Sequence, residues 1–436
     1  MEFLVTPGGS IRGEARVPGD KSVSHRSVML GALGEGTTEV RGFLEGEDAL
    51  ATVAAFRAMG VSIDGPTRGE LKIEGVGLTG LQAPGQPLDM GNSGTSMRLL
   101  SGILAGQNFE SELVGDASLM KRPMQRVITP LSRMGASIDS GAGGRPPLRI
   151  HGSGSLRGIH YDLPMASAQV KSCVLLAGLF ADGKTSVTEP APTRDHTERM
   201  LRGFGYDVQR EGDVISLSGG GSLRGTEIDV PADISSAAFF LVAASIADRA
   251  ELLLTHVGIN PTRTGVIDIL KLMGADIQIL REREVGGEPV ADIQVRSAAL
   301  KGIEIPRSLV PLAIDEFPAV FIAAACARGR TVLRGAEELR VKESDRISAM
   351  AEGLDTLGIE TEVLVDGLVI EGGQIGGGTV QTFHDHRIAM AFAIAGLRAE
   401  REIRVLECDH VSTSFPGFDA LARGLGLQIS ARETQE

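Results

Sequence analysis

The stretch Met59-Gly60-Val61-Ser62-Ile63 returns five more times in similar form along this 436-residue chain. The other copies are Met134-Gly135-Ala136-Ser137-Ile138, Phe204-Gly205-Tyr206-Asp207-Val208, Met273-Gly274-Ala275-Asp276-Ile277, Leu357-Gly358-Ile359-Glu360-Thr361 and Leu425-Gly426-Leu427-Gln428-Ile429. Glycine is typical of the position just after a helix, because a positive φ costs it no clash of a Cβ atom. The repeat, about one copy every seventy residues, therefore predicts six similar units in which a helix ends at glycine and a strand follows.

Two kinds of helix are predicted in these units. The helices that end at the repeated glycines are amphipathic, as over 48–59, 124–134 and 266–273. A second helix in each unit is rich in small residues and nearly apolar on all sides, which indicates a buried helix. These second helices are expected over 22–33, 94–105, 168–180, 235–246, 316–327 and 386–397. Each unit is then expected to contain strand, helix, strand, helix, strand and strand, an α/β plan with helices inside the sheets.

Composition argues against several classes of function. The formal net charge is −13, which disfavours a nucleic acid held by a broad basic face, and 4% aromatic residues with no Trp leave few side chains for stacking bases. The three cysteines, Cys173, Cys326 and Cys408, show neither metal spacing nor a disulfide pattern. No signal peptide or membrane-spanning segment is recognised. We therefore expect a soluble, cytoplasmic protein without a nucleic-acid or membrane partner.

The segment Pro18-Gly19-Asp20-Lys21-Ser22-Val23-Ser24-His25-Arg26 indicates an anion site. It places an ammonium, hydroxyls and a guanidinium where a buried helix begins, and a helix N-terminus carries partial positive charge. Cations such as Lys21, Arg26 and Arg387 are unfavourable at a helix start unless something negative binds there. A capped surface helix with solvated charges is the alternative. The other buried helices also start with polar residues, for which N-capping alone is an alternative explanation: Asn92-Ser93-Gly94-Thr95, Ser167-Ala168-Gln169, Asp233-Ile234-Ser235-Ser236, Asp315-Glu316 and His384-Asp385-His386-Arg387.

Three connecting segments add further charge. They are Lys121-Arg122-Pro123, Arg194-Asp195-His196-Thr197-Glu198 and Arg340-Val341-Lys342-Glu343-Ser344-Asp345-Arg346. Solvated helix starts would explain each segment alone. Together, these cations are enough to hold two anionic groups and to leave Asp315 or Glu343 for proton transfer. His384 and His386 lack a third ligand at suitable spacing, so we predict no metal site.

With these residues in view, the chain resembles the 5-enolpyruvylshikimate-3-phosphate synthase family from about residue 3 to residue 430. The motifs that carry the resemblance are Pro-Gly-Asp-Lys-Ser at 18–22, Gly-Asn-Ser-Gly-Thr at 91–95, Arg-Pro-Met at 122–124, Ser-Ala-Gln at 167–169, Lys-Glu-Ser-Asp-Arg at 342–346 and Asp-His-Arg at 385–387. The resemblance implies a two-domain inside-out α/β barrel of six βαβαββ-type units, three per domain. Domain 1 would contain residues 1–18 plus 232–436 and domain 2 residues 19–231, with the active site in the interdomain cleft.

The resemblance also implies the reaction and its residues. The family moves the enolpyruvyl group of phosphoenolpyruvate to shikimate 3-phosphate, through a tetrahedral intermediate and without a cofactor. Shikimate 3-phosphate would be held by Lys21, Ser22, Arg26, Ser167, Ala168, Gln169, Arg194, Asp315 and Lys342. Phosphoenolpyruvate would be held by Lys21, Gly94, Arg122, Gln169, Arg346 and Arg387. Asp315 would take the hydroxyl proton and Glu343, with Lys21 as a partner, would handle the proton at C3. We expect a monomer.

Within the family, three motifs resemble the subfamily that includes glyphosate-tolerant members. These are Ser-Ala-Gln-Val-Lys at 167–171, Arg194-Asp195-His196-Thr197-Glu198 and Asn260-Pro261-Thr262-Arg263. Thr413 stands where the other subfamily has a lysine that contacts phosphoenolpyruvate, while Gly94 is retained where the most tolerant members carry Ala. Two alternatives remain open: the sister enzyme that transfers the same group to a UDP-sugar, and a non-catalytic phosphate-binding protein on this scaffold.

Overall fold

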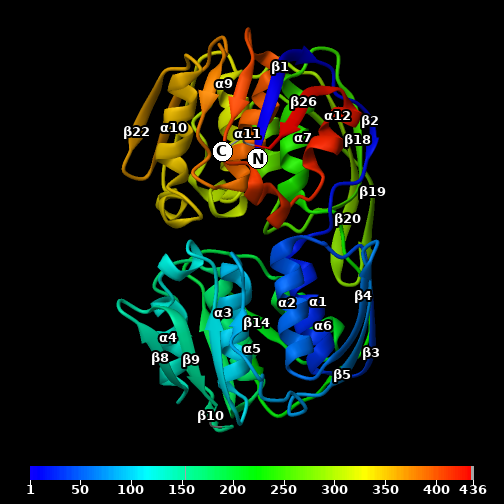
Figure 1. Cartoon of the computed structure of the whole chain (residues 1–436), viewed down its shortest axis with the longest axis vertical. Coiled ribbons are helices and arrows are strands. Elements are labelled where there is room, and N and C mark those ends of the chain that lie inside the picture. Colours follow the sequence, from blue (N-terminus) through cyan, green and yellow to red (C-terminus); the bar gives the residue numbers. More distant parts are fainter. Residues whose placement is uncertain (153, 434–436) are drawn as a thin grey trace. The chain divides into compact units, whose positions relative to one another are not determined.

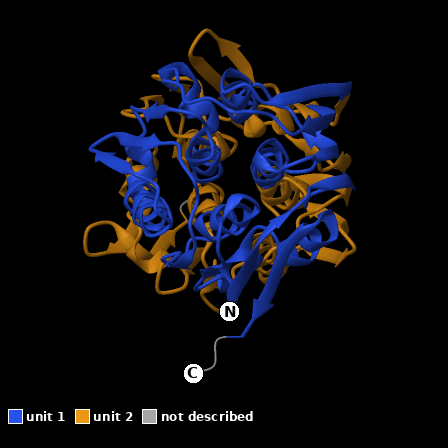
Figure 2. Ribbon diagram, turned by 90° about the horizontal axis from the view of Figure 1, so that it is seen from above, with its two compact units in different colours: residues 1–18, 231–283, 289–436 blue, residues 19–230, 284–288 orange. Residues whose placement is uncertain are grey.

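The computed structural model describes residues 1–152 and 154–433, and it divides the chain into two compact units (Figures 1 and 2). Unit 1 contains residues 1–18, 231–283 and 289–436, and unit 2 contains residues 19–230 and 284–288. Each unit has its own hydrophobic core, and the two cores share no residue. The chain passes from unit 1 to unit 2 after Pro18 and returns after Val230.

Each unit has six α-helices among the residues that the structure describes. In unit 2 they are α1 (Lys21–Leu33), α2 (Glu47–Ala58), α3 (Gly94–Ala105), α4 (Gln125–Arg133), α5 (Ala168–Gly178) and α6 (His196–Gly203). In unit 1 they are α7 (Ile234–Ile246), α8 (Gly265–Leu272), α9 (Phe317–Ala325), α10 (Arg346–Thr356), α11 (His386–Ala395) and α12 (Phe418–Leu425). Short 3-10 helices add η1 (Leu119–Lys121), η2 (Arg307–Leu309), η3 (Pro311–Ala313), η4 (Glu337–Val341), η5 (Gly396–Arg398) and η6 (Asp409–Thr413).

Three sheets of unit 2 share one strand order. The first strand runs parallel to the second, and the third and fourth complete the sheet in antiparallel fashion. One sheet has β6 (Leu88–Asp89), β7 (Glu110–Val114), β9 (Arg145–His151) and β8 (Ser137–Gly141); the next has β11 (His160–Asp162), β13 (Lys184–Thr188), β15 (Val214–Ser218) and β14 (Gln209–Glu211). In the third, β16 (Leu223–Arg224) and β17 (Glu227–Asp229) pair with β3 (Gly34–Arg41), followed by β5 (Glu70–Val76) and β4 (Ser62–Thr67). The short strands β10 (Leu156–Arg157) and β12 (Ala181–Asp182) pair separately.

The sheets of unit 1 have the same strand order, but in one of them the first strand comes from the amino-terminal segment. One has β2 (Arg12–Ala15), β18 (Glu251–Gly258), β20 (Glu288–Arg296) and β19 (Asp276–Val285); another has β24 (Gly378–Val380), β25 (Ile403–Val405), β1 (Glu2–Gly9) and β26 (Leu427–Arg432). The third has β21 (Arg330–Leu333), β23 (Gly367–Glu371) and β22 (Thr361–Leu364), with two parallel bridges, Lys301 to Arg328 and Glu304 to Val332, in the place of a first strand. Strand β2 fills the first place beside β18, whereas β16 and β17, which precede α7 in the chain, pair with β3. This exchange of first strands explains why the amino-terminal residues belong to unit 1.

The repeated glycines have the backbone conformation that the sequence predicts. Their φ angles are 88° for Gly60, 100° for Gly135, 83° for Gly205, 97° for Gly274, 84° for Gly358 and 112° for Gly426. Each follows a helix of the amphipathic kind, and the strands β4, β8, β14, β19, β22 and β26 begin within four residues. The prediction of a helix end followed by a strand is therefore confirmed at all six positions.

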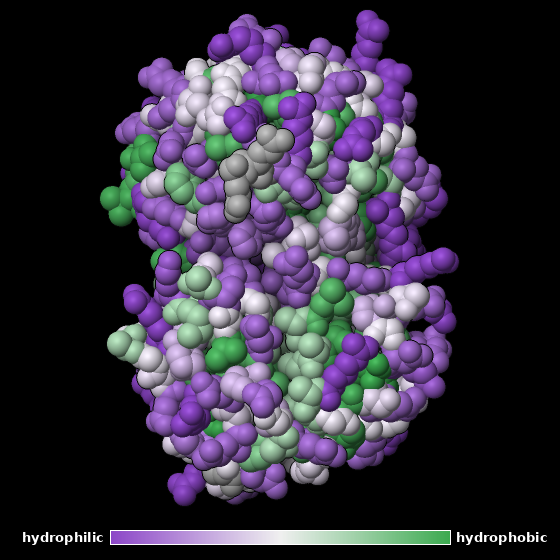
Figure 3. Space-filling model, in the orientation of Figure 1, coloured by the Kyte–Doolittle hydropathy of each residue, from purple (hydrophilic) through white to green (hydrophobic). Residues whose placement is uncertain are grey.

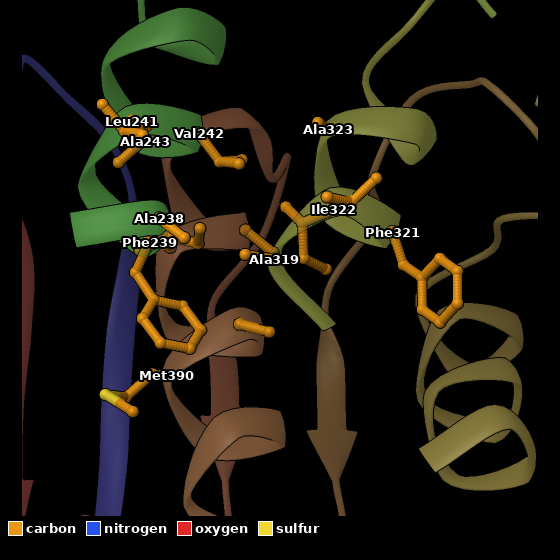
Figure 4. Close-up of a cluster of buried hydrophobic side chains, with 14 of the residues drawn as sticks. Ala238, Phe239, Leu241, Val242, Ala243, Ala319, Phe321, Ile322, Ala323 and Met390 are labelled. Carbon is orange, nitrogen blue, oxygen red and sulfur yellow. The ribbon is translucent and has the colours of Figure 1, made fainter. Parts of the chain in front are cut away.

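The predicted apolar helices are buried. Every residue of α7 and of α9 is buried, and α7, α9 and α11 contact one another, with small residues such as Ala238 and Ala319 at their contacts (Figure 4). The helix ends differ slightly from those expected: α9 begins at Phe317 rather than Glu316, because Glu316 is its N-cap and Pro318 fits the first turn. Helix α5 ends at Gly178, two residues early.

Polar residues cover most of the face seen in Figure 3, where hydrophobic residues lie in small groups. Large exposed hydrophobic residues among those described include Val365 and Val341. In the part of the chain that the structure describes, no helix combines the length and the apolar character that a bilayer crossing needs.

Candidate active site

Most of the residues predicted for unit 2 lie at or near the N-termini of its three buried helices, α1, α3 and α5. Asp20 caps α1, where its side chain accepts a hydrogen bond from the Val23 amide at 2.9 Å. Ser93 caps α3 and Ser167 caps α5 in the same way. Lys21, the first residue of α1, is half-buried and forms an ion pair with the buried Asp48. Ammonium, hydroxyls and backbone amides are thus gathered at the positive ends of three helix dipoles, which favours anion binding.

Arg26 lies deeper than its predicted role suggests. Its side chain is buried, and its donors bond Thr197 Oγ1 at 2.7 Å, Ser172 Oγ at 2.8 Å and the Ser22 carbonyl at 2.9 Å. Burial is the largest cause that lowers the pKa of Arg26 to about 10; Arg194 acts in the same direction, and the carboxylates of Glu198 and Asp20 oppose it. Arg26 therefore contributes positive charge from behind the helix start, with neutral partners for each nitrogen.

The sequence analysis does not single out Arg98, which the structure places with the predicted residues. Its Nη1 donates to Gln169 Oε1 at 2.6 Å, and Gln169 Nε2 donates to Thr95 Oγ1 at 2.9 Å. Arg98 follows Gly94 by four residues, and that spacing puts both on one face of α3. This spacing is the signal by which the sequence could have identified it.

Gly94 lies against two guanidinium groups. A Cβ atom built on Gly94 would lie 3.0 Å from Arg98 Nη1 and 3.2 Å from Arg122 Nη1. Arg122 is held by Asn92, whose Oδ1 accepts from Nη2 at 2.8 Å, and Asn92 donates in turn to Asp116 at 2.7 Å. The absence of a side chain at Gly94 therefore lets two cations approach the N-terminus of α3.

The remaining predicted residues of unit 2 surround the same helix ends. Ser22 is half-buried on the first turn of α1, and Ala168 is the half-buried first residue of α5. Arg194 is half-buried, close enough to Arg26 to lower its pKa. The structure thus brings Lys21, Ser22, Arg26, Gly94, Arg122, Ser167, Ala168, Gln169 and Arg194 to helix starts, or to segments beside them, within one unit.

A buried histidine lies behind this cluster. His25 Nδ1 is 2.8 Å from Thr52 Oγ1, which lies 2.8 Å from Ser96 Oγ, so hydroxyl groups join α1, α2 and α3. Burial is the largest cause that lowers the pKa of His25 well below 6.5, and the cations Lys21 and Arg26 act in the same direction. The ring is therefore neutral at pH 7.

The motif at 167–171 ends in a buried ion cluster. Lys171 is fully buried on α5, with Nζ 2.8 Å from Glu189 and 2.7 Å from Glu198. Glu198 lies on α6 beside Thr197, which accepts from Arg26. Charged groups therefore link α5 and α6 beneath the helix starts.

In unit 1, Asp315 and Lys342 face each other. Asp315 lies just before α9, and its Oδ1 is 3.2 Å from Lys342 Nζ. Glu338 on η4 also accepts from Lys342 Nζ, at 2.6 Å. Burial alone would lower the pKa of Lys342, but the carboxylates of Asp315 and Glu338 outweigh it and raise that pKa. Lys342 therefore remains charged between two carboxylates.

Arg346, the first residue of α10, is surrounded by three carboxylates. Its Nε donates to Asp385 Oδ2 at 2.8 Å, its Nη2 donates to Glu343 Oε2 at 2.7 Å, and its Nη1 lies 3.6 Å from Asp315. Burial disfavours the charge on Arg346, but Asp385 and Glu343 raise its pKa nonetheless. Asp385 is fully buried as the N-cap of α11; burial would raise its pKa, and Arg346 instead holds it below the usual value.

Arg387 and Thr413 complete unit 1. Arg387 is half-buried on the first turn of α11, and its guanidinium forms no hydrogen bond or ion pair with the described residues. Thr413 is buried, and its hydroxyl donates to the His410 carbonyl at 2.6 Å. Among the described residues, no group of three or more His, Cys, Asp or Glu is gathered in a way that would hold a metal ion.

Comparison with known proteins gives one family. The family model described as EPSP synthase (3-phosphoshikimate 1-carboxyvinyltransferase) matches residues 5–421. A 3-phosphoshikimate 1-carboxyvinyltransferase of Alkalilimnicola ehrlichii is 65% identical over 436 residues, which is 100% of this chain and 98% of that protein. The protein of the same name from Methylococcus capsulatus is 66% identical over 427 residues, 98% of each chain.

Solved structures agree with this match. The EPSP synthase of Acinetobacter baumannii is similar with a TM-score of 0.90 and 60% identity, over 99% of this chain and 100% of that one. The enolpyruvyl transferase NikO of Streptomyces tendae has a TM-score of 0.78 at 16% identity, over 98% of both chains, which is a likeness of fold alone.

Proposed function

Since the chain belongs to the EPSP synthase family, we propose that it transfers the enolpyruvyl group of phosphoenolpyruvate to the 5-hydroxyl of shikimate 3-phosphate. This reaction is a step of the shikimate pathway, which leads to the aromatic amino acids. The 5-hydroxyl oxygen adds to C2 of phosphoenolpyruvate and loses its proton, while C3 gains a proton, which gives a tetrahedral intermediate. That intermediate then loses phosphate and a proton from C3. No electrons are exchanged with another group, so the reaction needs no redox cofactor.

Unit 2 supplies anion binding in this proposal. Lys21, Ser22, Arg26, Ser167, Ala168, Gln169 and Arg194 hold shikimate 3-phosphate, and Lys21, Gly94, Arg122 and Gln169 hold phosphoenolpyruvate. The helix N-termini support this role, and so do the guanidinium groups of Arg26, Arg98 and Arg122, which lie beside hydroxyl, carbonyl and amide groups. Arg98 joins them through its bond to Gln169.

Unit 1 supplies proton transfer. We assign Asp315 as the acceptor of the 5-hydroxyl proton and Glu343 as the group that handles the proton at C3, with Lys21 of unit 2 as its partner. Lys342 contributes to shikimate 3-phosphate binding, and Arg346 and Arg387 to phosphoenolpyruvate binding. Support comes from position: Asp315 lies 3.2 Å from Lys342 and Glu343 lies 2.7 Å from Arg346, so both carboxylates stand beside cations assigned to substrate binding.

The proposal extends to the architecture of each unit. The buried helices α1, α3 and α5 of unit 2, and α7, α9 and α11 of unit 1, lie inside three sheets in an inside-out α/β arrangement. Their burial and the shared strand order of the sheets support it. Buried helices place their N-termini, and so the functional residues, at one end of a unit.

The observation that carries the proposed function is the position of the predicted residues of unit 2 at the starts of α1, α3 and α5, or in segments beside them. The test is to mix the purified protein with shikimate 3-phosphate and phosphoenolpyruvate and to follow phosphate release and the enolpyruvyl ether by phosphorus and proton NMR. We expect one phosphate for each ether formed, and neither with one substrate alone.

A UDP-sugar acceptor in a parallel reaction tests the sister activity. Transfer to the UDP-sugar but not to shikimate 3-phosphate would overturn the proposed substrate. Binding of both substrates without any phosphate release would identify a phosphate-binding protein instead.

A further inference from the structure

The motif Asn260-Pro261-Thr262-Arg263 has no part in the proposed substrate contacts, yet the structure turns it inward. Asn260 Oδ1 accepts from the amide of Thr262 at 2.9 Å and from its hydroxyl at 2.7 Å, which closes a tight turn. The next residue, Arg263, is 2% exposed. A guanidinium is costly to bury unless carboxylates and further hydrogen bonds compensate its charge. The groups that bond Arg263 therefore indicate what it does in the fold.

Arg263 joins the starts of two buried helices. Its Nη2 donates to Asp233 Oδ1 at 3.0 Å and to Ser235 Oγ at 2.6 Å. The Ser235 hydroxyl donates to Glu316 Oε1, and that carboxylate oxygen lies 3.8 Å from Arg263 Nη2. Asp233 is the N-cap of α7 and Glu316 is the N-cap residue of α9.

This network is buried on every side. Asp233 is 5% exposed, and Ser235 and Glu316 are 1% exposed. Hydrophobic residues of similar volume often stabilise a protein as well as a buried ion cluster does. Hydrogen bonds, by contrast, are directional, so they hold the starts of α7 and α9 in one geometry. The benefit of the network is therefore the position of the backbone that it anchors.

That backbone carries Asp315. Glu316 follows Asp315 directly, and it points into the core while the carboxylate of Asp315 lies near Lys342 and Arg346, at 3.2 Å and 3.6 Å. A displacement of Glu316 would change both distances. A misplacement of about 1 Å in a catalytic group is enough to cost about 100-fold in rate.

We propose that Arg263 and Glu316 are positioning residues, which act through the backbone at 315–316 to hold the Asp315 carboxylate in place for proton transfer. The proposal rests on the proposed function of Asp315 as proton acceptor. Neither residue contacts substrate in it, so their loss changes turnover and leaves substrate binding in place.

The test compares Glu316→Gln with Phe321→Leu. Phe321 is buried on the same helix α9 and takes no part in the hydrogen bonds of the network, so Phe321→Leu reports the effect of lost core packing. We expect Glu316→Gln to lower kcat by about 10- to 100-fold, with KM for both substrates and the Kd of shikimate 3-phosphate changed less than about 3-fold. Phe321→Leu, at a similar loss of Tm, is expected to keep kcat within about 3-fold.

A double-mutant cycle makes the test specific. If Glu316 acts through Asp315, Glu316→Gln will have little further effect on the residual kcat of Asp315→Asn. Arg263→Lys serves as the second variant if Glu316→Gln does not fold; it keeps the charge but loses the fork of donors, and we expect the same loss of kcat.

Three results would overturn the proposal: an unchanged kcat in both network variants, a loss equal to that of Phe321→Leu at the same Tm, or additive losses with Asp315→Asn. Failure of the proposed function is distinguishable, because the wild-type protein itself would then form no enolpyruvyl ether.

Discussion

The cations of the two units are surrounded by different groups. In unit 2, Arg26, Arg98 and Arg122 donate to hydroxyl, amide and carbonyl groups. In unit 1, Lys342 and Arg346 lie among the carboxylates of Asp315, Glu338, Glu343 and Asp385. A cation beside neutral groups attracts an anion more strongly than a cation whose charge is offset by nearby carboxylates. This difference agrees with the proposal that unit 2 mainly binds the substrates and unit 1 moves the protons.

Lys21 and Arg387 limit this contrast. Lys21 of unit 2 forms an ion pair with the buried Asp48, and Arg387 of unit 1 has no carboxylate partner among the described residues. This pairing agrees with the proposal that Lys21 takes part in both substrate binding and proton transfer. No other residue predicted for unit 2 is assigned both roles.

The largest effect is expected at Asp315. Asp315→Asn keeps the shape of the side chain but cannot accept a proton, so we expect kcat to fall by about 10² to 10⁴-fold. Binding of shikimate 3-phosphate, measured by calorimetry, is expected to change less than about 5-fold. A variant with more than about half of the wild-type kcat would remove Asp315 from the proposed mechanism.

A smaller effect of a different kind is expected at Arg122. Arg122→Gln removes the charge that Asn92 holds in place, and a hydrogen bond to a charged group contributes about 1.5–3 kcal/mol. KM for phosphoenolpyruvate is then expected to rise by about 10- to 100-fold, with kcat changed far less. The control is Arg126→Gln on α4, outside the predicted set. Loss of kcat at unchanged KM would contradict a binding role for unit 2.

The Gly94→Ala variant tests whether the start of α3 limits the length of the ligand that unit 2 binds. Its added Cβ in Gly94→Ala would press on Arg98 and Arg122, which are flexible at their ends, so we expect a cost of about 1–2 kcal/mol. Glyphosate resembles phosphoenolpyruvate in charge but is longer. We therefore expect glyphosate inhibition of the wild type, weakened by about 5- to 30-fold in Gly94→Ala, and a smaller rise in the KM of phosphoenolpyruvate. Equal rises of both constants would show that Gly94 does not limit ligand length.

The smallest expected effect concerns acid stability. His25 has a lowered pKa when folded, so below its unfolded value of 6.5 the unfolded chain binds the extra proton and the folded state loses stability. The loss is about 1.4 kcal/mol for each pH unit between pH 6.5 and the lowered folded pKa. Urea unfolding at pH 7.5 and pH 5.5 checks this: His25→Gln is expected to lose less stability on acidification than the wild type or His160→Gln, since His160 is exposed. An equal loss in all three proteins would exclude buried His25 as the cause.

The repeat was the most informative part of the sequence for the fold. Each repeated glycine has a positive φ, because a helix end and a following strand impose the same local geometry in every unit. The sequence did not predict that β2 pairs with β18 while β16 and β17 pair with β3, because strand pairing between distant segments leaves no local pattern.

For the site, the sequence located charged residues but not their partners. Arg26 and Arg387 both occur near helix starts, yet Arg26 is buried with each of its nitrogens bonded and Arg387 has no protein partner among the described residues. That difference depends on contacts with Thr197 and Ser172, more than 140 residues away in the chain. Long-range contacts of this kind also hide the network of Arg263 and Glu316.

The most direct test of the division between the units is a single-turnover measurement with enzyme in excess over shikimate 3-phosphate and with phosphoenolpyruvate varied up to saturation. Product formation is followed by rapid quench in the wild type, Arg122→Gln and Asp315→Asn. We predict that increasing phosphoenolpyruvate restores Arg122→Gln to nearly the wild-type rate, while no concentration restores Asp315→Asn. Restoration of Asp315→Asn by substrate, or a rate of Arg122→Gln that stays low at saturation, would contradict the assignment of binding to unit 2 and proton transfer to unit 1.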